Sequence, residues 1–208
     1  MMISHQYGNY QKYYNPNPIQ KHLIERFLRT ISLLVKQTSA LVLADIGCAE
    51  GFLPRYLRKL HPQIRFTGID IDRSALKRGK ELNPWFPATQ ANIYEMPYKS
   101  NAFDLVLCLE VLEHLERPDR AVAELKRITR RYCLFSVPRE PFFRMANFLR
   151  GKNLTRLGND VDHINHWNKA SFIKFMKGFD LRIVDMKTSF PWLISLTELD
   201  HELEKIQS

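Results

Sequence analysis

Two glycines four residues apart stand close to an acidic residue in the segment Asp45-Ile46-Gly47-Cys48-Ala49-Glu50-Gly51. Glycine lets the backbone turn sharply and come close to a ligand, because no Cβ stands in the way. The segment follows an apolar run and precedes a run with helical spacing, and a helix N-terminus offers free N–H groups to an anion. This spacing predicts a loop that binds a ligand through its backbone.

A second acidic segment, Gly68-Ile69-Asp70-Ile71-Asp72, follows the next apolar run. A carboxylate at the end of a second strand can accept hydrogen bonds from both hydroxyls of a ribose. Asp72 is the better placed of the two acids to cap a helix, so Asp70 is the candidate ribose ligand. The fingerprint of NAD enzymes, G-x-G-x-x-G, is absent because position 49 is Ala and no third glycine follows in register.

A second group of titratable residues comprises Glu110, Glu113 and His114, with His163 and His166 farther along the chain. If Glu110 starts a turn after a strand, the next two lie near it at i+3 and i+4. We expect catalytic roles for His114, Glu113 and His166, because an imidazole can act as a base toward a hydroxyl. A divalent metal is the alternative, with Glu110, Glu113, His114 and His163 as ligands. A purely structural role, with His163 anchoring a loop, also stays open.

Apolar periodicity predicts the elements that carry these residues. Strands are expected over 41–46, 65–69, 86–91, 103–109, 132–137, 181–186 and 190–196, and helices from Pro18 onward and over 52–60, 74–82, 118–128 and 168–177. Alternating strands and helices form a parallel sheet with right-handed crossovers. The predicted fold is therefore α/β and doubly wound, with a mostly parallel seven-stranded sheet flanked by helices.

The length of 208 residues suits one domain. Within it we expect an N-terminal lid and helix (1–38), a cofactor-binding core (39–137), a substrate-cap insertion (138–167) and a closing helix with strands (168–208). The lid is expected to close over the cofactor and exclude water through four tyrosines, Tyr7, Tyr10, Tyr13 and Tyr14.

The net charge of +9 fits either a soluble basic protein or one with an anionic partner such as nucleic acid. Nucleic acid is not favoured, because no separate RNA-binding module is visible and the basic residues lack interleaved aromatics. No apolar run approaches the ~20 residues that cross a bilayer, and the N-terminus has no apolar signal-peptide core. The three cysteines form no metal-like pair, and their odd number argues against a disulfide framework, so we expect a protein of the reducing cytoplasm. No feature indicates an oligomeric state.

From Asp45 to Pro138 the chain resembles the class I S-adenosylmethionine (SAM)-dependent methyltransferases, in particular the type 11 group. The two segments above carry the resemblance, together with Ala91-Asn92-Ile93 and Leu109-Glu110-Val111-Leu112-Glu113-His114-Leu115. It implies a Rossmann-like fold and SAM as cofactor. The implied cofactor-binding residues are Asp45, Gly47, Cys48 and Gly51 for the methionine part and Asp70 for the ribose. Ile71 is implied to flank the adenine and Asn92 to face its amine, and Ile93 and Leu109 are further implied contacts. Two positions depart from the pattern, Ala49 in place of Gly and Asn92 in place of Asp.

The resemblance implies an enzyme that moves a methyl group from SAM to an acceptor. We expect a small-molecule or lipid/glycan-precursor acceptor, methylated on oxygen. Displacement at a sulfonium mainly requires alignment of the nucleophile with the methyl group and exclusion of water. One alternative is a metal-assisted RNA 2′-O-methyltransferase, because the Glu/His group resembles the metal site of RNA 3′-end 2′-O-methyltransferases. The other is a SAM-binding protein without catalysis.

Overall fold

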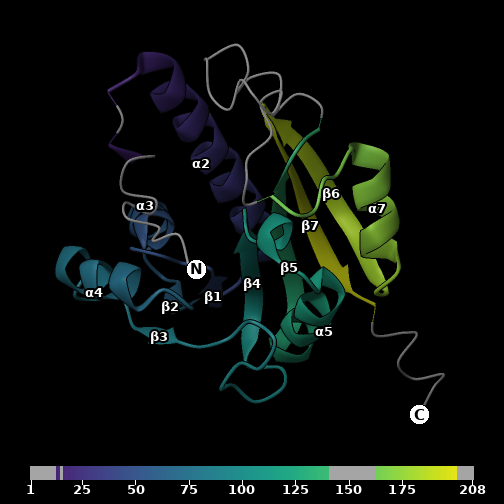
Figure 1. Ribbon diagram of the computed structural model, residues 1–208. Coiled ribbons are helices and arrows are strands. Elements are labelled where there is room, and N and C mark those ends of the chain that lie inside the picture. The colour runs from purple at the N-terminus through teal and green to yellow at the C-terminus, as the bar shows by residue number, and fades with distance from the viewer. Residues whose placement is uncertain (1–12, 15, 141–162, 201–208) are drawn as a thin grey trace.

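The computed structural model describes residues 13–14, 16–140 and 163–200. One sheet forms the centre, with strand order β3-β2-β1-β4-β5-β7-β6 (Figure 1). Its strands are β1 (Val42–Ile46), β2 (Arg65–Asp70), β3 (Ala88–Gln90), β4 (Phe103–Leu109), β5 (Thr129–Pro138), β6 (Leu181–Ser189) and β7 (Trp192–Leu199). The helices are α2 (Pro18–Thr38), α3 (Phe52–Leu60), α4 (Arg73–Leu82), α5 (Pro118–Ile128) and α7 (Lys169–Lys177), with a short 3-10 helix η1 (Leu112–His114).

The first five strands run parallel, and β7 is antiparallel to both of its neighbours, β5 and β6. The predicted doubly wound, mostly parallel seven-stranded sheet is confirmed. Strand β1 lies between β2 and β4, so the strand order reverses beside it. In an open α/β sheet, ligands bind outside the carboxyl ends of the strands at such a switch point. The ends of β1, β2 and β4 are therefore where a cofactor site is expected.

Both faces of the sheet are buried, which explains the nearly continuous apolar run of β4. Along this strand Leu105 and Leu107 belong to one core cluster, and Val106 and Cys108 belong to the other. Helices α2 and α3 supply side chains to the first cluster, and α5 and α7 supply the second. The two layers of helices fix the sheet, and the sheet in turn fixes the loops at its carboxyl edge.

Side chains that cap the backbone N–H groups determine where α2 and α4 begin. The Asn17 side chain accepts from the backbone N–H groups of Ile19 and Gln20, with Pro18 in the first turn of α2. Asp72 caps α4 as expected, which leaves Asp70 outside the helix. Strand β3 is shorter than predicted. Its predicted first residue, Phe86, instead packs in the core cluster beneath the glycine loop.

No helix among the described residues is long and apolar enough to cross a membrane. Cys48, Cys108 and Cys133 are buried thiols without disulfide bonds. Two of the predicted lid tyrosines, Tyr7 and Tyr10, lie outside the described residues, as does most of the predicted cap over 138–167.

Candidate cofactor and acceptor site

The glycine loop at the end of β1 has the backbone shape that only glycine adopts without strain. Gly47 and Gly51 have φ angles of 78° and 76°, in the left-handed region. A Cβ on Gly47 would lie 2.4 Å from Cγ2 of Val111, so this position also lacks room for a side chain. The N–H groups of Gly47 and Cys48 donate to the carbonyl of Ile69 at 2.8 and 3.0 Å. The loop is thereby fixed to β2.

An ion pair between the buried Glu50 and the partly exposed Arg78 holds the loop. The Glu50 side chain is fully buried, and one of its oxygens accepts from Nε and Nη2 of Arg78 at 3.1 and 2.8 Å. The Asn83 side chain donates to the backbone carbonyl of Glu50 at 2.8 Å. Helix α4 therefore holds the start of α3 in place. Sequence reasoning missed Arg78 and Asn83, because no spacing relates them to the loop; the acid at Glu50 was the one available signal.

Asp70 joins the two acidic segments of the sequence. One carboxylate oxygen accepts from the N–H of Ala49 at 2.7 Å, and the other accepts from the N–H of Asp72 at 2.8 Å. Burial raises the pKa of Asp70, and these N–H groups oppose the rise. Each carboxylate oxygen can accept a further hydrogen bond, so Asp70 can hold the loop and still bind a ribose.

Ala49 occupies the position at which the family pattern has glycine, and its φ angle of 44° is left-handed. An L-residue with a Cβ in this conformation costs roughly 1–2 kcal/mol. Its N–H bond to Asp70 helps to keep it there. The Ala49 backbone is therefore strained, and the loop keeps its left-handed turn at this position.

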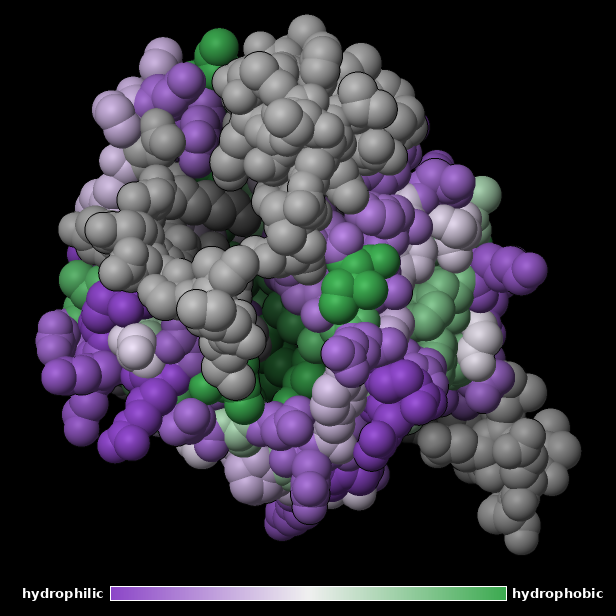
Figure 2. All heavy atoms as spheres, in the orientation of Figure 1, coloured by the Kyte–Doolittle hydropathy of each residue, from purple (hydrophilic) through white to green (hydrophobic). Residues whose placement is uncertain are grey.

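An open cleft of about 500 Å³, counted with its opening to solvent, lies against the loop. Its walls include Asp45, Gly47, Cys48, Leu109 and Glu110, four of which were predicted to bind the cofactor. Hydrophobic side chains form the floor of a hollow between the α4 side and the α5 side of the molecule (Figure 2).

Aromatic rings close the other side of the cleft. Tyr13, Phe27 and Phe52 line it, and the rings of Tyr13 and Phe52 stack with centroids 4.7 Å apart. Asp45 faces these rings; its burial and the nearby charge of Asp70 raise its pKa to about 7. Tyr13 is thus the one of the four predicted lid tyrosines that lines the cleft among the described residues.

The residues predicted to surround the adenine lie at the ends of β2 and β3. Ile71 is 67% exposed, an unusual exposure for an isoleucine beside a buried strand end. Asn92 is exposed, and its side-chain oxygen accepts from the N–H of Tyr94 at 3.0 Å. Ile93 is half-buried. A flat ring resting on Ile71 would remove this apolar side chain from water.

The ligating atoms of Glu113, His114 and His163 all lie within 4.8 Å of one another. The two imidazole rings have centroids 5.0 Å apart, and Glu113 is buried. The backbone carbonyl of Glu113 accepts from the N–H groups of Ile164 and Asn165 at 2.8 and 3.0 Å. These bonds bring the segment around Glu113 next to the segment around His163, as the predicted Glu/His group requires.

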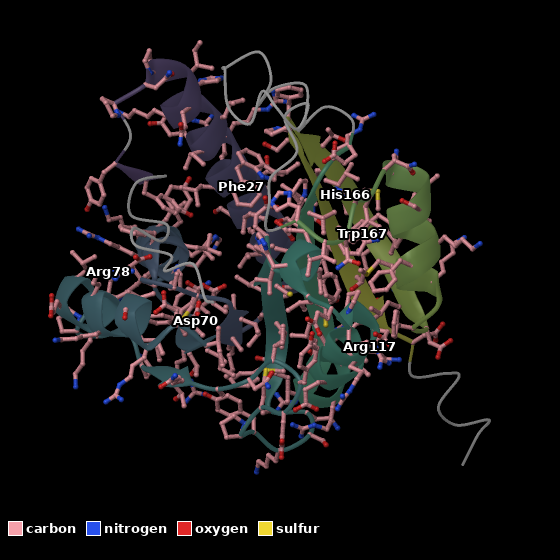
Figure 3. All side chains as sticks on the ribbon, viewed as in Figure 1. Phe27, Asp70, Arg78, Arg117, His166 and Trp167 are labelled. Carbon is pink, nitrogen blue, oxygen red and sulfur yellow. The ribbon has the colours of Figure 1, made fainter. Side chains whose placement is uncertain are left out.

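Glu110 and His166 lie apart from that group. Glu110 lines the cofactor cleft with a left-handed φ of 59°, and one of its oxygens accepts from Oγ of Ser136 at 2.8 Å. His166 lies on the β5 side (Figure 3), with Nδ1 3.6 Å from an oxygen of Glu140. The expected group of two carboxylates and two imidazoles is therefore not a single cluster, because Glu110 lies in the cofactor cleft and not beside Glu113. Glu140 was not singled out from the sequence.

Basic residues are frequent between 117 and 131, in and beside α5, but many of them are paired with acids. Four arginines of this segment pair with acids: Arg117 with Asp119, Arg127 with Glu124, Arg130 with Asp104 and Arg131 with Glu198. Much of the positive charge of this segment is therefore already balanced by neighbouring carboxylates.

Comparison with known proteins gives a family match over residues 44–136, to the methyltransferase domain family. The chain is 26% identical over 113 residues to the malonyl-[acyl-carrier protein] O-methyltransferase of Legionella pneumophila, covering 53% of this chain and 39% of that protein. It is 32% identical over 98 residues to the mitochondrial ubiquinone biosynthesis O-methyltransferase of Candida albicans, covering 43% and 30%. The matched region spans less than half the length of these relatives.

Solved structures share the fold over most of the chain. The magnesium protoporphyrin IX methyltransferase of Synechocystis with bound SAH superimposes with a TM-score of 0.68 at 18% identity, covering 91% of this chain and 92% of that one. The methyltransferase domain of bacterial CtHen1 gives a TM-score of 0.65 at 22% identity, covering 85% and 100%. The Rossmann-like class I methyltransferase fold is confirmed.

Proposed function

We propose that this chain, whose residues 44–136 match the methyltransferase domain family, transfers the methyl group of SAM to an oxygen of a small-molecule or lipid/glycan-precursor acceptor. The observation that carries the proposal is the meeting of Asp70 with the glycine loop, beside an open cleft at the sheet's switch point. Bound SAM supplies an electrophilic methyl group on a positively charged sulfur.

The roles of the chain's own residues follow from their places. The backbone around Gly47 and Gly51 would bind the methionine part, and Asp70 would accept from the ribose hydroxyls. Ile71 and Asn92 would flank the adenine. Because the loop is fixed by buried bonds, these residues are preorganised, and alignment is the main requirement of an in-line displacement.

Two observations support oxygen as the methylated atom: the titratable residues beyond the ends of β4 and β5, which we call the acceptor edge, and the names of two relatives. A hydroxyl nucleophile needs a base, and Glu113, His114 and His166 stand beyond the ends of β4 and β5. The Legionella and Candida relatives are both named as O-methyltransferases. Their names denote acceptors attached to a carrier protein or belonging to quinone synthesis, which fits a small or lipid-like acceptor here.

A metal-assisted RNA 2′-O-methyltransferase is the second candidate. It is favoured by the Glu113–His114–His163 group, since one carboxylate and two imidazoles suit a divalent transition metal. These three residues would hold the ion, which would act as a Lewis acid. Glu110, the fourth expected ligand, lies in the cofactor cleft instead. The paired arginines around α5 leave less charge for a polyanion, so we place this candidate second.

Transfer of labelled methyl groups tests these proposals. The protein is incubated with methyl-labelled SAM and separate pools of membrane lipids, glycan precursors, small metabolites and total RNA, with Asp70→Ala as the inactive control. Label in a lipid or small-molecule pool supports the first proposal. Label in RNA that is lost with EDTA and restored by a divalent ion supports the second. SAM binding without label in any pool would leave a SAM-binding protein without catalysis and overturn both.

A further inference from the structure

We infer that the outer faces of α2 and α3 together bind the surface of a membrane that contains anionic lipids. This part of the protein surface, which we call the basic face, exposes the cationic side chains of Lys21, Arg26, Arg29, Lys36, Arg55 and Lys59. Exposed aliphatic side chains lie among them. The inference goes beyond the proposed function and stands apart from it, because membrane binding requires neither SAM nor a methyl acceptor.

The charge of the basic face is not balanced within the protein. Helix α2 contains four lysines and arginines and one acid, Glu25, and α3 contains three lysines and arginines and no acid. Across the part of the chain that the structure describes, no ion pair involves any of the six cations. Arg58 of α3 is not counted, because its guanidinium lies over the ring of Trp85, 4.2 Å from the centroid. The basic face thus differs from the segment around α5, whose arginines are paired.

Cations and aliphatic side chains share one ridge of α2. Spacings of three and four residues place four exposed side chains on the same side of the helix: Arg26, Arg29, Leu33 and Lys36. Leu33 is 60% exposed, although it stands in the middle of an otherwise well-packed helix. At the start of the helix, Ile19 is 69% exposed. The ridge therefore offers positive charge and apolar surface together.

A buried hydrogen bond joins the end of α3 to this ridge. Oγ of Ser32, the neighbour of Leu33, lies 2.9 Å from Nε2 of His61, which follows the last residue of α3. Burial lowers the pKa of His61, and the nearby charge of Lys36 lowers it further, which places Lys36 beside this end of α3. Leu60 is 54% exposed at the same end. The two helices therefore present one surface, on the side of the sheet away from α7 (Figure 1).

Anionic lipid is the partner that suits both kinds of side chain. Each lysine or arginine near a negatively charged leaflet strengthens binding roughly fivefold, and aliphatic side chains between them can enter the boundary with the acyl chains. A nucleic acid would engage the cations but would leave Ile19, Leu33 and Leu60 in water or against phosphates. The described faces of α2 and α3 also expose no aromatic ring on which bases could stack. The aliphatic side chains therefore favour a membrane.

The inner side of α2 borders the cofactor cleft, because the buried ring of Phe27 lines that cleft. A bilayer in contact with the outer side of the same helix would lie roughly one helix diameter, 10–12 Å, from the cleft wall. Such a position suits an acceptor that is carried in the bilayer.

Flotation of the full chain with lipid vesicles, in the absence of SAM, tests this inference. One set of vesicles is phosphatidylcholine alone, and the other contains about one-third phosphatidylglycerol, which gives a negative surface. We expect at least about tenfold tighter binding to the anionic vesicles. The double variant Arg26→Gln, Arg29→Gln should weaken that binding about tenfold or more, since each cation contributes roughly fivefold. Leu33→Gln, which keeps every charge, should weaken it about threefold or more through lost apolar contact.

A matched control removes the same charge elsewhere. The double variant Arg117→Gln, Arg131→Gln lacks two arginines that are paired with acids, and it should bind anionic vesicles within about twofold of the wild type. Thermal unfolding checks that each variant is folded. Equal losses in the two double variants, or equal binding of the wild type to both kinds of vesicle, would overturn the membrane-binding face.

Binding to an RNA oligonucleotide separates the other polyanion. Tighter binding to RNA than to anionic vesicles, weakened by Arg26→Gln with Arg29→Gln and unaffected by Leu33→Gln, would assign the basic face to nucleic acid and overturn the inference. SAM binding is measured separately on the same samples. A chain that binds SAM but no vesicle would overturn membrane binding alone, and one that binds anionic vesicles but not SAM would overturn the proposed function alone.

Discussion

The two edges of the site are built in different ways. The cofactor edge consists of backbone fixed by buried bonds: the loop donates to Ile69, and Glu50 beneath it is paired with Arg78. The acceptor edge consists of side chains from distant segments. Glu113 and His163 meet there because the N–H groups of Ile164 and Asn165, next to His163, donate to the backbone carbonyl of Glu113. A rigid edge suits a common cofactor, and an edge of titratable side chains suits chemistry that differs from one acceptor to another.

Breaking the support of the cofactor edge should have the largest effect. Arg78→Met removes the partly exposed guanidinium that pairs with the fully buried Glu50 carboxylate, and leaving a buried charged acceptor without its partner costs about 3 kcal/mol. We expect a loss of this size in the free energy of unfolding, measured by urea denaturation. Arg117→Met removes an exposed pair with Asp119 and should cost far less. Similar losses in the two variants would show that the loop does not depend on this pair.

The charge of Asp45 should make the cofactor edge sensitive to pH. Its folded-state pKa of about 7 lies above the ordinary value near ~3.9, so stability falls as pH rises between the two. Asp45→Asn removes this penalty. The variant should therefore gain stability over the wild type steadily from pH 4 to pH 8, measured by denaturation at each pH.

Asp104 provides a control of opposite sign. Although burial acts the other way, the N–H groups of Leu41 and Val42 and the guanidinium of Arg130 lower the pKa of Asp104. Asp104→Asn should therefore be less stable than the wild type above about pH 4, and this deficit should shrink as the pH falls below about 4. The same pH trend in both variants would contradict the account of Asp45.

The acceptor edge should respond to metal if the second candidate function holds. The wild type should then bind one Mn²⁺ or Zn²⁺, and His163→Ala should weaken that binding about tenfold or more, or about 1.4 kcal/mol. His166→Ala is the matched control, because His166 lies against Glu140 outside the group. Calorimetry measures both. If the wild type does not bind either ion, the three residues act as bases or supports and the metal-assisted proposal fails.

The smallest expected effect concerns the strained position in the loop. Ala49→Gly should raise the free energy of unfolding by about 1 kcal/mol, because glycine adopts a φ of 44° without a Cβ penalty. Ala75→Gly lies inside α4 and should lower it by about 1 kcal/mol. Denaturant unfolding compares the two. A loss of stability in Ala49→Gly would mean that the Cβ makes contacts worth more than the strain.

The sequence predicted the parts of the site that depend on neighbouring residues. The glycine loop, Asp70 and the Asp72 cap each follow from a short segment and the strand before it. The sequence indicated that Glu113 would meet His163 or His166 but not which of the two, because β5 and a long segment separate Glu113 from both histidines. The place of Glu110 could not be read from its i+3 spacing, since its left-handed backbone directs it to the cofactor cleft.

The partners of the loop were beyond the sequence for a related reason. Arg78 and Asn83 act through the packing of α4 against the start of α3, and helical spacing gives no sign of which polar residue will meet a buried acid. The sequence likewise could not show which acids pair with the arginines around α5, and one of those acids, Glu198, lies on β7. Long-range pairing of charges needs the fold itself.

Calorimetric titration of SAM into the wild type and into two variants of Asp70 tests the central claim most directly. Asp70→Ala should weaken binding by about 2–3 kcal/mol, or roughly 30- to 150-fold, the scale for lost hydrogen bonds to a charged group. Asp70→Asn keeps an oxygen for the N–H of Ala49 and should lose less affinity. Saturable binding by the wild type that falls in this order is the predicted result, and an unchanged affinity in Asp70→Ala would contradict the assignment of the ribose site.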